Sequence, residues 1–133
     1  KRHRKLSLFY EILNKLVIVC QRKKLRLVIE NPLSTSGTHY LTHFWCLKPQ
    51  IIDKDRTQNG DYFKKPTQYW FIGLEPKRNL VFEPLQQVDV MKQRYVKNDN
   101  KLGIDRKTVR SMIHPQYANR FIRQYLIDES EVV

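Results

Sequence analysis

The chain has 133 residues, of which 41% are hydrophobic and 11% aromatic, so its composition excludes a wholly disordered protein and fits a single domain. Its 25 Lys and Arg residues against 13 acidic residues give a net charge of +12. Such a charge predicts an anionic partner, with nucleic acid first and an anionic membrane surface second. The alternative is a basic surface that serves only solubility.

The cysteines and the hydropathy indicate a compartment. Cys20 and Cys46 lie in apolar surroundings, form no Cys-x-x-Cys pair and have no histidine at metal-ligand spacing, so we expect buried free thiols in a reducing compartment and no metal site. No uninterrupted apolar run approaches the ~18 residues of a membrane span, and the basic start is not followed by a signal-peptide core. We therefore expect a cytoplasmic protein.

Residues 5–24 are predicted to form a helix, because apolar residues recur there at steps of three and four. Three cations, at residues 22–24, suit the negative end of its dipole. Residues 1–26 contain nine Lys and Arg residues against one acidic residue, a net of +8, so one end of the molecule carries most of the positive charge. The apolar positions expected to face the core are Leu6, Phe9, Ile12, Leu13, Leu16, Val17 and Cys20.

A strand is predicted at residues 25–30, and its nearly continuous apolar character favours a central, parallel position. A short helix at 39–47, with Tyr40, Leu41, Phe44 and Trp45 inward, follows a loop. Residues 51–60 begin extended and end in an Asn-Gly turn. Further strands are predicted at 67–72 and 80–83. We expect Trp45, Trp70, Phe71 and Phe82 to belong to the core.

The remainder is predicted as a charged loop followed by helices. Residues 86–101 are polar, with a short helix near 88–94, and helices follow at 106–112 and 115–127. Pro115 suits the first helical position, and His114 is a helix-start residue. The fold prediction is one α/β domain over 1–133, with a basic helix (5–24), a core (25–84), a charged loop (85–105) and C-terminal helices (106–127). Its sheet is predicted to be partial, Rossmann-like and flanked by helices.

Two polar segments are candidate sites. Glu30, with Asn31 and Pro32, lies where the first strand is predicted to end, and ligands of parallel sheets bind at the carboxyl ends of strands. Glu30 could equally cap the next segment or pair with a lysine. In the second segment, the turn at 58–61 precedes Lys64, Lys65 and Thr67, which could hold a phosphate backbone. The alternative is a solvated hairpin.

Taken together, Ile29-Glu30-Asn31-Pro32 and Gly60-Asp61, Lys65-Pro66-Thr67 and Trp70 resemble the C-terminal half of phage-type cytosine-5 DNA methyltransferases. The tail from Arg110 to Ala118 is similar to that family's closing helix. The resemblance implies a methyltransferase-type sheet and a cytosine flipped out of the duplex. Glu30 would be the catalytic residue that holds the flipped base. Asn31 and Pro32 would shape its pocket, and the expected nucleic-acid contacts are Lys64, Lys65, Thr67, Arg22, Lys23, Lys24, Arg2 and Arg4.

The chain also departs from that family. No glycine-rich cofactor loop precedes Glu30, Cys20 lies inside the predicted first helix, Cys46 follows Glu30, and Phe63 stands where family members carry an Arg. This chain alone should therefore bind no cofactor and methylate nothing, and S-adenosylmethionine would bind only if missing segments completed it.

Three readings remain open: part of a longer enzyme, one half of a split enzyme completed by a second protein chain, or a non-enzymatic factor of a phage or mobile element. Such a factor would be an inhibitor or adaptor for a nucleic-acid-processing protein, such as a CRISPR nuclease, or its nucleic acid. The expected partner is DNA or RNA, with no membrane.

Overall fold

The computed structural model describes residues 2–34, 40–90 and 106–128. In chain order its elements are α1 (Arg2–Arg22), β1 (Leu27–Pro32), α2 (Tyr40–His43), β2 (Ile51–Asp53), the 3-10 helix η1 (Arg56–Asn59), β3 (Thr67–Ile72), α3 (Arg106–Ser111) and α4 (Pro115–Tyr125). The prediction of a mixed α/β fold is confirmed. Within the described ranges, no helix has the length and apolar character needed to cross a membrane.

The sheet has three strands in the order β1-β3-β2, and both pairings are antiparallel. β1 pairs with β3 from Leu27 opposite Ile72 to Pro32 opposite Thr67. The prediction that the first strand is central and parallel is therefore wrong. β1 is an edge of this sheet, and an edge strand tolerates the missing N–H of Pro32.

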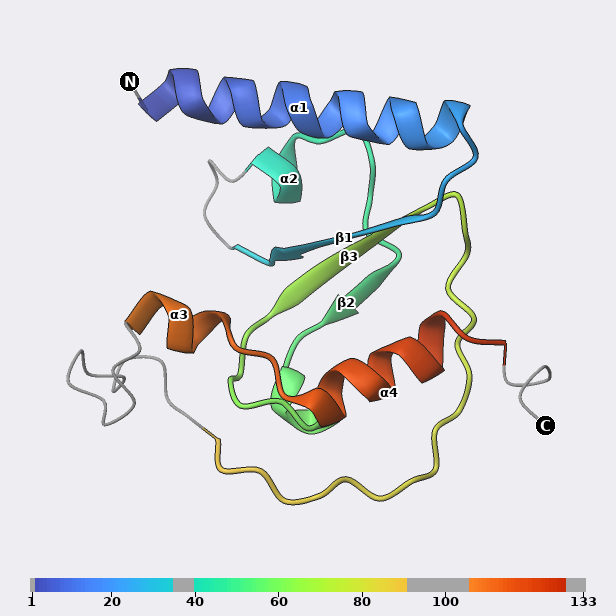
Figure 1. Ribbon diagram of the computed structural model, residues 1–133. Helices are drawn as coiled ribbons and strands as arrows, with labels where there is room; N and C mark the ends of the chain where they lie inside the picture. The colour runs from blue at the N-terminus through green and yellow to red at the C-terminus, as the bar shows by residue number, and fades with distance from the viewer. Residues whose placement is uncertain (1, 35–39, 91–105, 129–133) are drawn as a thin grey trace.

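α1 and α2 cover one face of the sheet (Figure 1). Leu13, Val17 and Cys20 of α1 pack against Trp70 and Ile72 of β3. The remaining buried members of this cluster are Leu41 and Trp45, and the indole Nε1 of Trp45 donates to Asn14 Oδ1 at 2.8 Å. α1 is confirmed with slightly earlier bounds than predicted.

α4 covers the opposite face of the sheet (Figure 1). Phe121 and Tyr125 of α4 pack against Tyr69 and Phe71, with ring centroids of Tyr69 and Phe121 4.5 Å apart. Because helices lie on both faces, all six residues of β3 are buried. β1 is partly covered on both faces as well, with Leu27 and Ile29 against the α1 side and Val28 against the α4 side, and this gives the continuous apolar pattern that also marks parallel strands.

A buried polar cluster joins η1 to α4. Arg56 and Asp61 form an ion pair in which each side chain is at most 3% exposed, and the Arg56 guanidinium lies 4.6 Å from the ring centroid of Tyr117. Asp61 Oδ1 also accepts from the backbone N–H of His114 at 2.9 Å. His114 Nδ1 accepts from the N–H of Gln116, so its predicted role at the helix start is confirmed, as is Pro115 at the first turn.

Two neutral tyrosines complete this cluster. Tyr117 donates to Asp53 Oδ2 at 3.0 Å, and since its proton is used there, the Tyr69 hydroxyl donates to the Tyr117 oxygen at 2.7 Å. Burial raises the pKa of Tyr69 to about 12 and also raises the pKa of Tyr117. Both hydroxyls therefore stay protonated and hold α4 to the sheet.

The segment after β3 contains no strand, contrary to the prediction for residues 80–83. Arg120 donates to the carbonyls of Val81 and Glu83, at 3.2 and 3.3 Å, so α4 rather than a neighbouring strand satisfies these groups. Figure 1 shows this segment passing alongside α4 as an extended coil. Phe82 is 87% exposed, so its predicted place in the core is also wrong.

Other predictions need smaller corrections. Residue 39 lies outside the described ranges, and of residues 40–47 only Tyr40–His43 are helical. Phe44, at 63%, and Cys46 are exposed, contrary to the predictions for them. Residues 88–90 are not helical, and residues 91–94 lie outside the described ranges. Trp45, Trp70 and Phe71 are buried as predicted. α3 and α4 fall where the sequence placed them, ending one and two residues earlier.

Candidate nucleic-acid interface

The chain leaves α1 through a tight cationic turn, residues 22–26, which we call the basic turn. Leu25 N–H donates to Cys20 O at 2.8 Å, and Lys24 N–H to Gln21 O at 3.4 Å. This pair of bonds is the Schellman arrangement that ends many helices, and it requires a left-handed residue at the position of Lys24. Lys24 adopts it with φ of 55°. Glycine is the residue usually found there, because a Cβ costs roughly 1–2 kcal/mol in this conformation.

The four cations of the basic turn, Arg22, Lys23, Lys24 and Arg26, are all exposed. Among the described residues none of them forms an ion pair; the pairs found are Lys15–Glu11, Arg56–Asp61 and Arg123–Glu83. The basic turn therefore presents uncompensated positive charge to solvent.

Gly73 fixes the basic turn against the end of β3. Its φ is 78°, and a Cβ at this position would lie 2.5 Å from the backbone oxygen of Leu25. The backbones of the two turns therefore approach more closely than any side chain would permit.

The two motif segments behind the methyltransferase resemblance lie side by side, although more than 30 residues separate them in the chain. Asn31 pairs with Gln68, Pro32 pairs with Thr67, and the N–H of Leu33 donates to Pro66 O at 2.9 Å. We call this end of the β1–β3 ladder the motif corner; it places Asn31 and Pro32 opposite Gln68 and Thr67, whereas Glu30 is opposite Tyr69 and Lys64 and Lys65 lie beyond the end of the ladder.

Within the motif corner, the individual residues differ from expectation. Glu30 is exposed but does not end its strand, because β1 continues through Pro32. Thr67 is 0% exposed and its hydroxyl donates to Lys65 O at 2.8 Å, so the prediction that Thr67 contacts nucleic acid is wrong. Lys64 is exposed and Lys65 half-buried. Asn31 Oδ1 is buried without a hydrogen-bond partner among the described atoms.

The remaining predicted cations do not join the motif corner. The basic turn lies at the Leu27 end of β1 and the motif corner at the Pro32 end, five residues or about 17 Å apart. Arg4 is exposed near the start of α1, about 27 Å along the helix from Arg22. The side chain of Arg2 lies outside the described part of the structure. The predicted contacts thus fall into separate groups.

Lys64 also acts on its own surroundings. Burial of Asp55 favours the neutral carboxyl group, but bonds from Thr57, together with Gln58 and the charge of Lys64, outweigh this and lower the pKa of Asp55. Asp55 is the N-cap of η1, whose C-cap is Gly60 with φ of 93°, so the predicted Asn-Gly turn is confirmed. Lys64 therefore contributes to holding the turn as well as to the surface charge.

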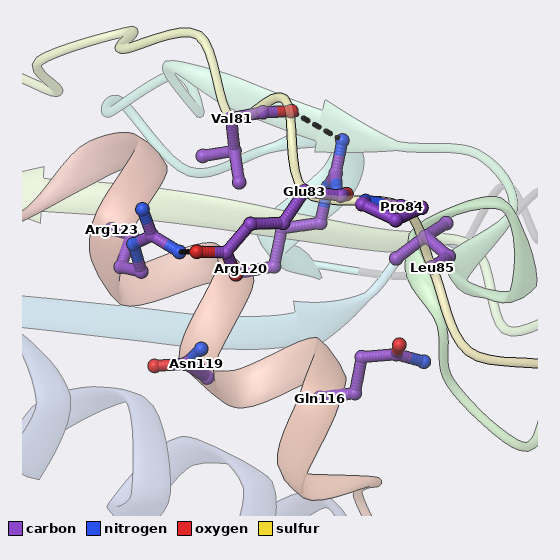
Figure 2. A pocket seen from close by; sticks show the side chains of 8 residues that line it. All are labelled: Val81, Glu83, Pro84, Leu85, Gln116, Asn119, Arg120 and Arg123. Atoms are coloured by element: carbon purple, nitrogen blue, oxygen red, sulfur yellow. Dashed lines mark hydrogen bonds and ion pairs between the residues drawn. The ribbon is translucent and has the colours of Figure 1, made fainter.

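A pocket between α4 and residues 81–85 does not suit a nucleobase. Figure 2 shows Arg120 and Arg123 reaching from α4 towards Val81 and Glu83, and Arg123 pairs with Glu83 at 2.7 Å. Its volume is about 40 Å³, with room for roughly three water molecules. It is a packing seam that holds the extended segment, and it lies away from both candidate surfaces.

Sequence reasoning did not single out Arg26 as a residue of the basic turn, and it did not predict the left-handed conformation of Lys24. Arg26 belongs to the basic turn but was not singled out, although the local density of cations could have indicated it. The left-handed conformation of Lys24 gives no signal in the sequence, because a lysine is atypical of that position.

Comparison with known proteins gives no relative from which the role of the basic turn or the motif corner could be inferred. The chain matches no protein-family model, no curated protein and no solved structure.

Proposed function

We propose that this chain binds nucleic acid through its sugar-phosphate backbone, with the basic turn as the principal contact. The observation that carries the proposal is the group of four exposed cations without ion-pair partners in the described structure, of which Lys24 occupies a position that favours glycine. A net charge of +12 supports it.

An alternative explanation of the basic turn is that its cations only complement the dipole of α1. Such an interaction contributes about 0.3–1 kcal/mol per charge and needs no particular residue at the left-handed position. Lysine at that position instead costs roughly 1–2 kcal/mol, which favours a role for its charge outside the fold. Contacts to phosphates carry no sequence information, so we expect micromolar affinity with little sequence preference.

The proposal is tested by fluorescence anisotropy with a labelled duplex DNA. The triple variant Arg22→Gln/Lys23→Gln/Lys24→Gln should weaken binding at least tenfold. The matched control Lys48→Gln/Lys54→Gln/Lys77→Gln removes the same charge from exposed lysines on other segments and should weaken binding much less. Equal losses would show that net charge alone drives binding, and an unchanged affinity in the first variant would reject the basic turn.

We further propose that the motif corner binds a flipped-out base, the role that the family resemblance implies for Glu30. The pairing of Asn31 and Pro32 with Gln68 and Thr67 supports it, because it brings the ends of the two motif segments to one end of the sheet. Glu30, which is exposed, would hold a flipped cytosine by its polar edge. The nucleophile, the cofactor site and the rest of a methyltransferase-type sheet would come from other segments or a second chain.

This role is separable from phosphate binding. A duplex with a mismatched cytosine should bind more tightly than the matched duplex, because a mismatched base is easier to unstack. Glu30→Gln should remove that preference and leave the affinity for the matched duplex unchanged. Absence of a preference in the unsubstituted protein would reject the role of Glu30 without affecting that of the basic turn.

A further inference from the structure

α1 carries a second apolar stripe that its own fold does not cover. The buried stripe consists of Leu13, Val17 and Cys20. What we call the outer stripe consists of Phe9, Ile12, Leu16 and Val19, which are 52%, 56%, 44% and 44% exposed. The sequence predicted that three of these four residues face the core, and the structure places them at the surface instead.

The spacing of the outer stripe is that of a helix-packing seam. Its residues follow one another at steps of three, four and three, the a/d pattern by which one α-helix packs on another. At 100° per residue the centre of the outer stripe lies about 90° around α1 from the centre of the buried stripe. A helix could therefore pack on this seam without displacing the sheet.

The charges beside the outer stripe indicate the character of such a helix. Leu8, Lys15 and Arg22 follow at intervals of seven along one border, the positions from which charged side chains reach a partner helix. Lys15 is exposed and pairs only within α1, with Glu11 at 3.1 Å. The border is thus apolar at one end and cationic over the rest, which complements acidic residues along the edge of a partner.

We propose that the outer stripe of α1 binds an amphipathic helix of a partner protein, apolar at its seam positions and acidic along the facing edge. A second copy of this chain fits poorly, because residues 1–26 carry a net charge of +8 in each copy. A bilayer surface is the other occupant that an apolar stripe with a cationic border suits, and the vesicle assay below distinguishes it from a protein helix.

The proposal goes beyond nucleic-acid binding and involves the side of α1, where Arg22 is shared between the basic turn and the border of the outer stripe. It gives the chain two simultaneous contacts, with a phosphate backbone at the end of α1 and with a protein helix along its side. An adaptor of a nucleic-acid-processing protein would have these two contacts.

The test uses the whole chain and a labelled synthetic probe. The probe is a four-heptad peptide with Ile and Leu at its seam positions and Glu at the flanking positions, so that it repels its own copies. A second peptide has Lys at the flanking positions. The acidic peptide should bind and the basic peptide should bind at least tenfold more weakly, as measured by fluorescence anisotropy.

Paired variants locate the contact on α1. Ile12→Ser/Leu16→Ser should weaken binding of the acidic peptide at least tenfold and leave duplex DNA binding unchanged. Ile18→Ser is the matched control, because Ile18 is 45% exposed on the same helix but lies outside the outer stripe. Circular dichroism of each variant establishes that the fold is retained.

Four outcomes would overturn the proposal. The first is equal binding of the two peptides, and the second is an equal loss of binding with Ile18→Ser. The third is that the chain binds phosphatidylserine vesicles but not the acidic peptide, and that Ile12→Ser/Leu16→Ser abolishes this vesicle binding. The fourth is a dimer in sedimentation that the double variant abolishes. The third would assign the outer stripe to a lipid surface and the fourth to a second copy.

Discussion

The left-handed conformation of Lys24 predicts that the difference in stability between a Gly and an Ala variant has opposite signs at residues 24 and 23. Lys24 has φ of 55°, whereas Lys23 is not among the described residues with positive φ. Replacing either lysine by Ala or by Gly removes the same charge, so the difference between the Gly and Ala variants isolates the backbone. At residue 24 the Gly variant avoids a left-handed penalty of roughly 1–2 kcal/mol and loses about 0.5–1 kcal/mol of backbone entropy.

The Gly variant at residue 24 should therefore be as stable as the Ala variant or more stable by up to about 1.5 kcal/mol, while at residue 23 Ala should be more stable than Gly by about 0.5–1 kcal/mol. The free energy of unfolding can be measured in urea from the fluorescence of Trp45 and Trp70, which are buried 5.3 Å apart. A Gly variant at residue 24 that is less stable than the Ala variant by about 0.5–1 kcal/mol, as expected at residue 23, would refute the left-handed turn and the reasoning built on it.

Four further predictions follow from the described contacts. Gly73→Ala should lower the melting temperature markedly in calorimetry, because its Cβ would meet the Leu25 backbone oxygen at 2.5 Å; an unchanged value would contradict this contact. Asp61→Asn should destabilise by about 3–5 kcal/mol in urea, because the charge of Arg56 stays buried without its partner. The pKa of Tyr69 is raised to about 12 in the folded chain, from about 10 in the unfolded chain. The stabilisation that the protonated hydroxyl provides is therefore complete below pH 10 and disappears as the pH rises towards 12. Over that range the urea midpoint should fall less in Tyr69→Phe than in the unsubstituted chain. Glu30→Gln, at an exposed site, should change stability by less than about 0.5 kcal/mol, which thermal unfolding can check.

The sequence was most informative where one periodicity dominates. α1, β3 and α4 were predicted with bounds correct to within three residues, because their apolar patterns repeat at helical spacing or form a short buried run. His114 and Pro115 marked the start of α4 for local chemical reasons that need no tertiary context.

The sequence was least informative where tertiary contacts decide. The apolar pattern that suggested parallel strands reflects helices on both faces of an antiparallel sheet. The segment at 80–83 has strand-like residues but is held by Arg120, which is 37 residues from Glu83 along the chain. The apolar periodicity of α1 covers more of the helix surface than its own core can bury, so the pattern alone could not separate Leu13 from Ile12.

The candidate site was predicted in part. The motif resemblance identified two segments whose ends pair at Pro32 and Thr67, but it could not show that Thr67 is inaccessible. The cations at residues 22–24 were found from charge alone, yet their distance from the motif corner depends on the strand pairing.

The most direct test of phosphate binding by the basic turn is the dependence of duplex DNA affinity on salt. The slope of log K against log salt concentration is negative, and it becomes shallower by about 0.9 for each phosphate contact that is lost. Between about 50 and 200 mM salt, Arg22→Gln/Lys23→Gln/Lys24→Gln should therefore have a slope shallower by about 2.7 than the unsubstituted chain. Identical slopes for the two proteins would contradict the account, because the basic turn would then release no counterions on binding.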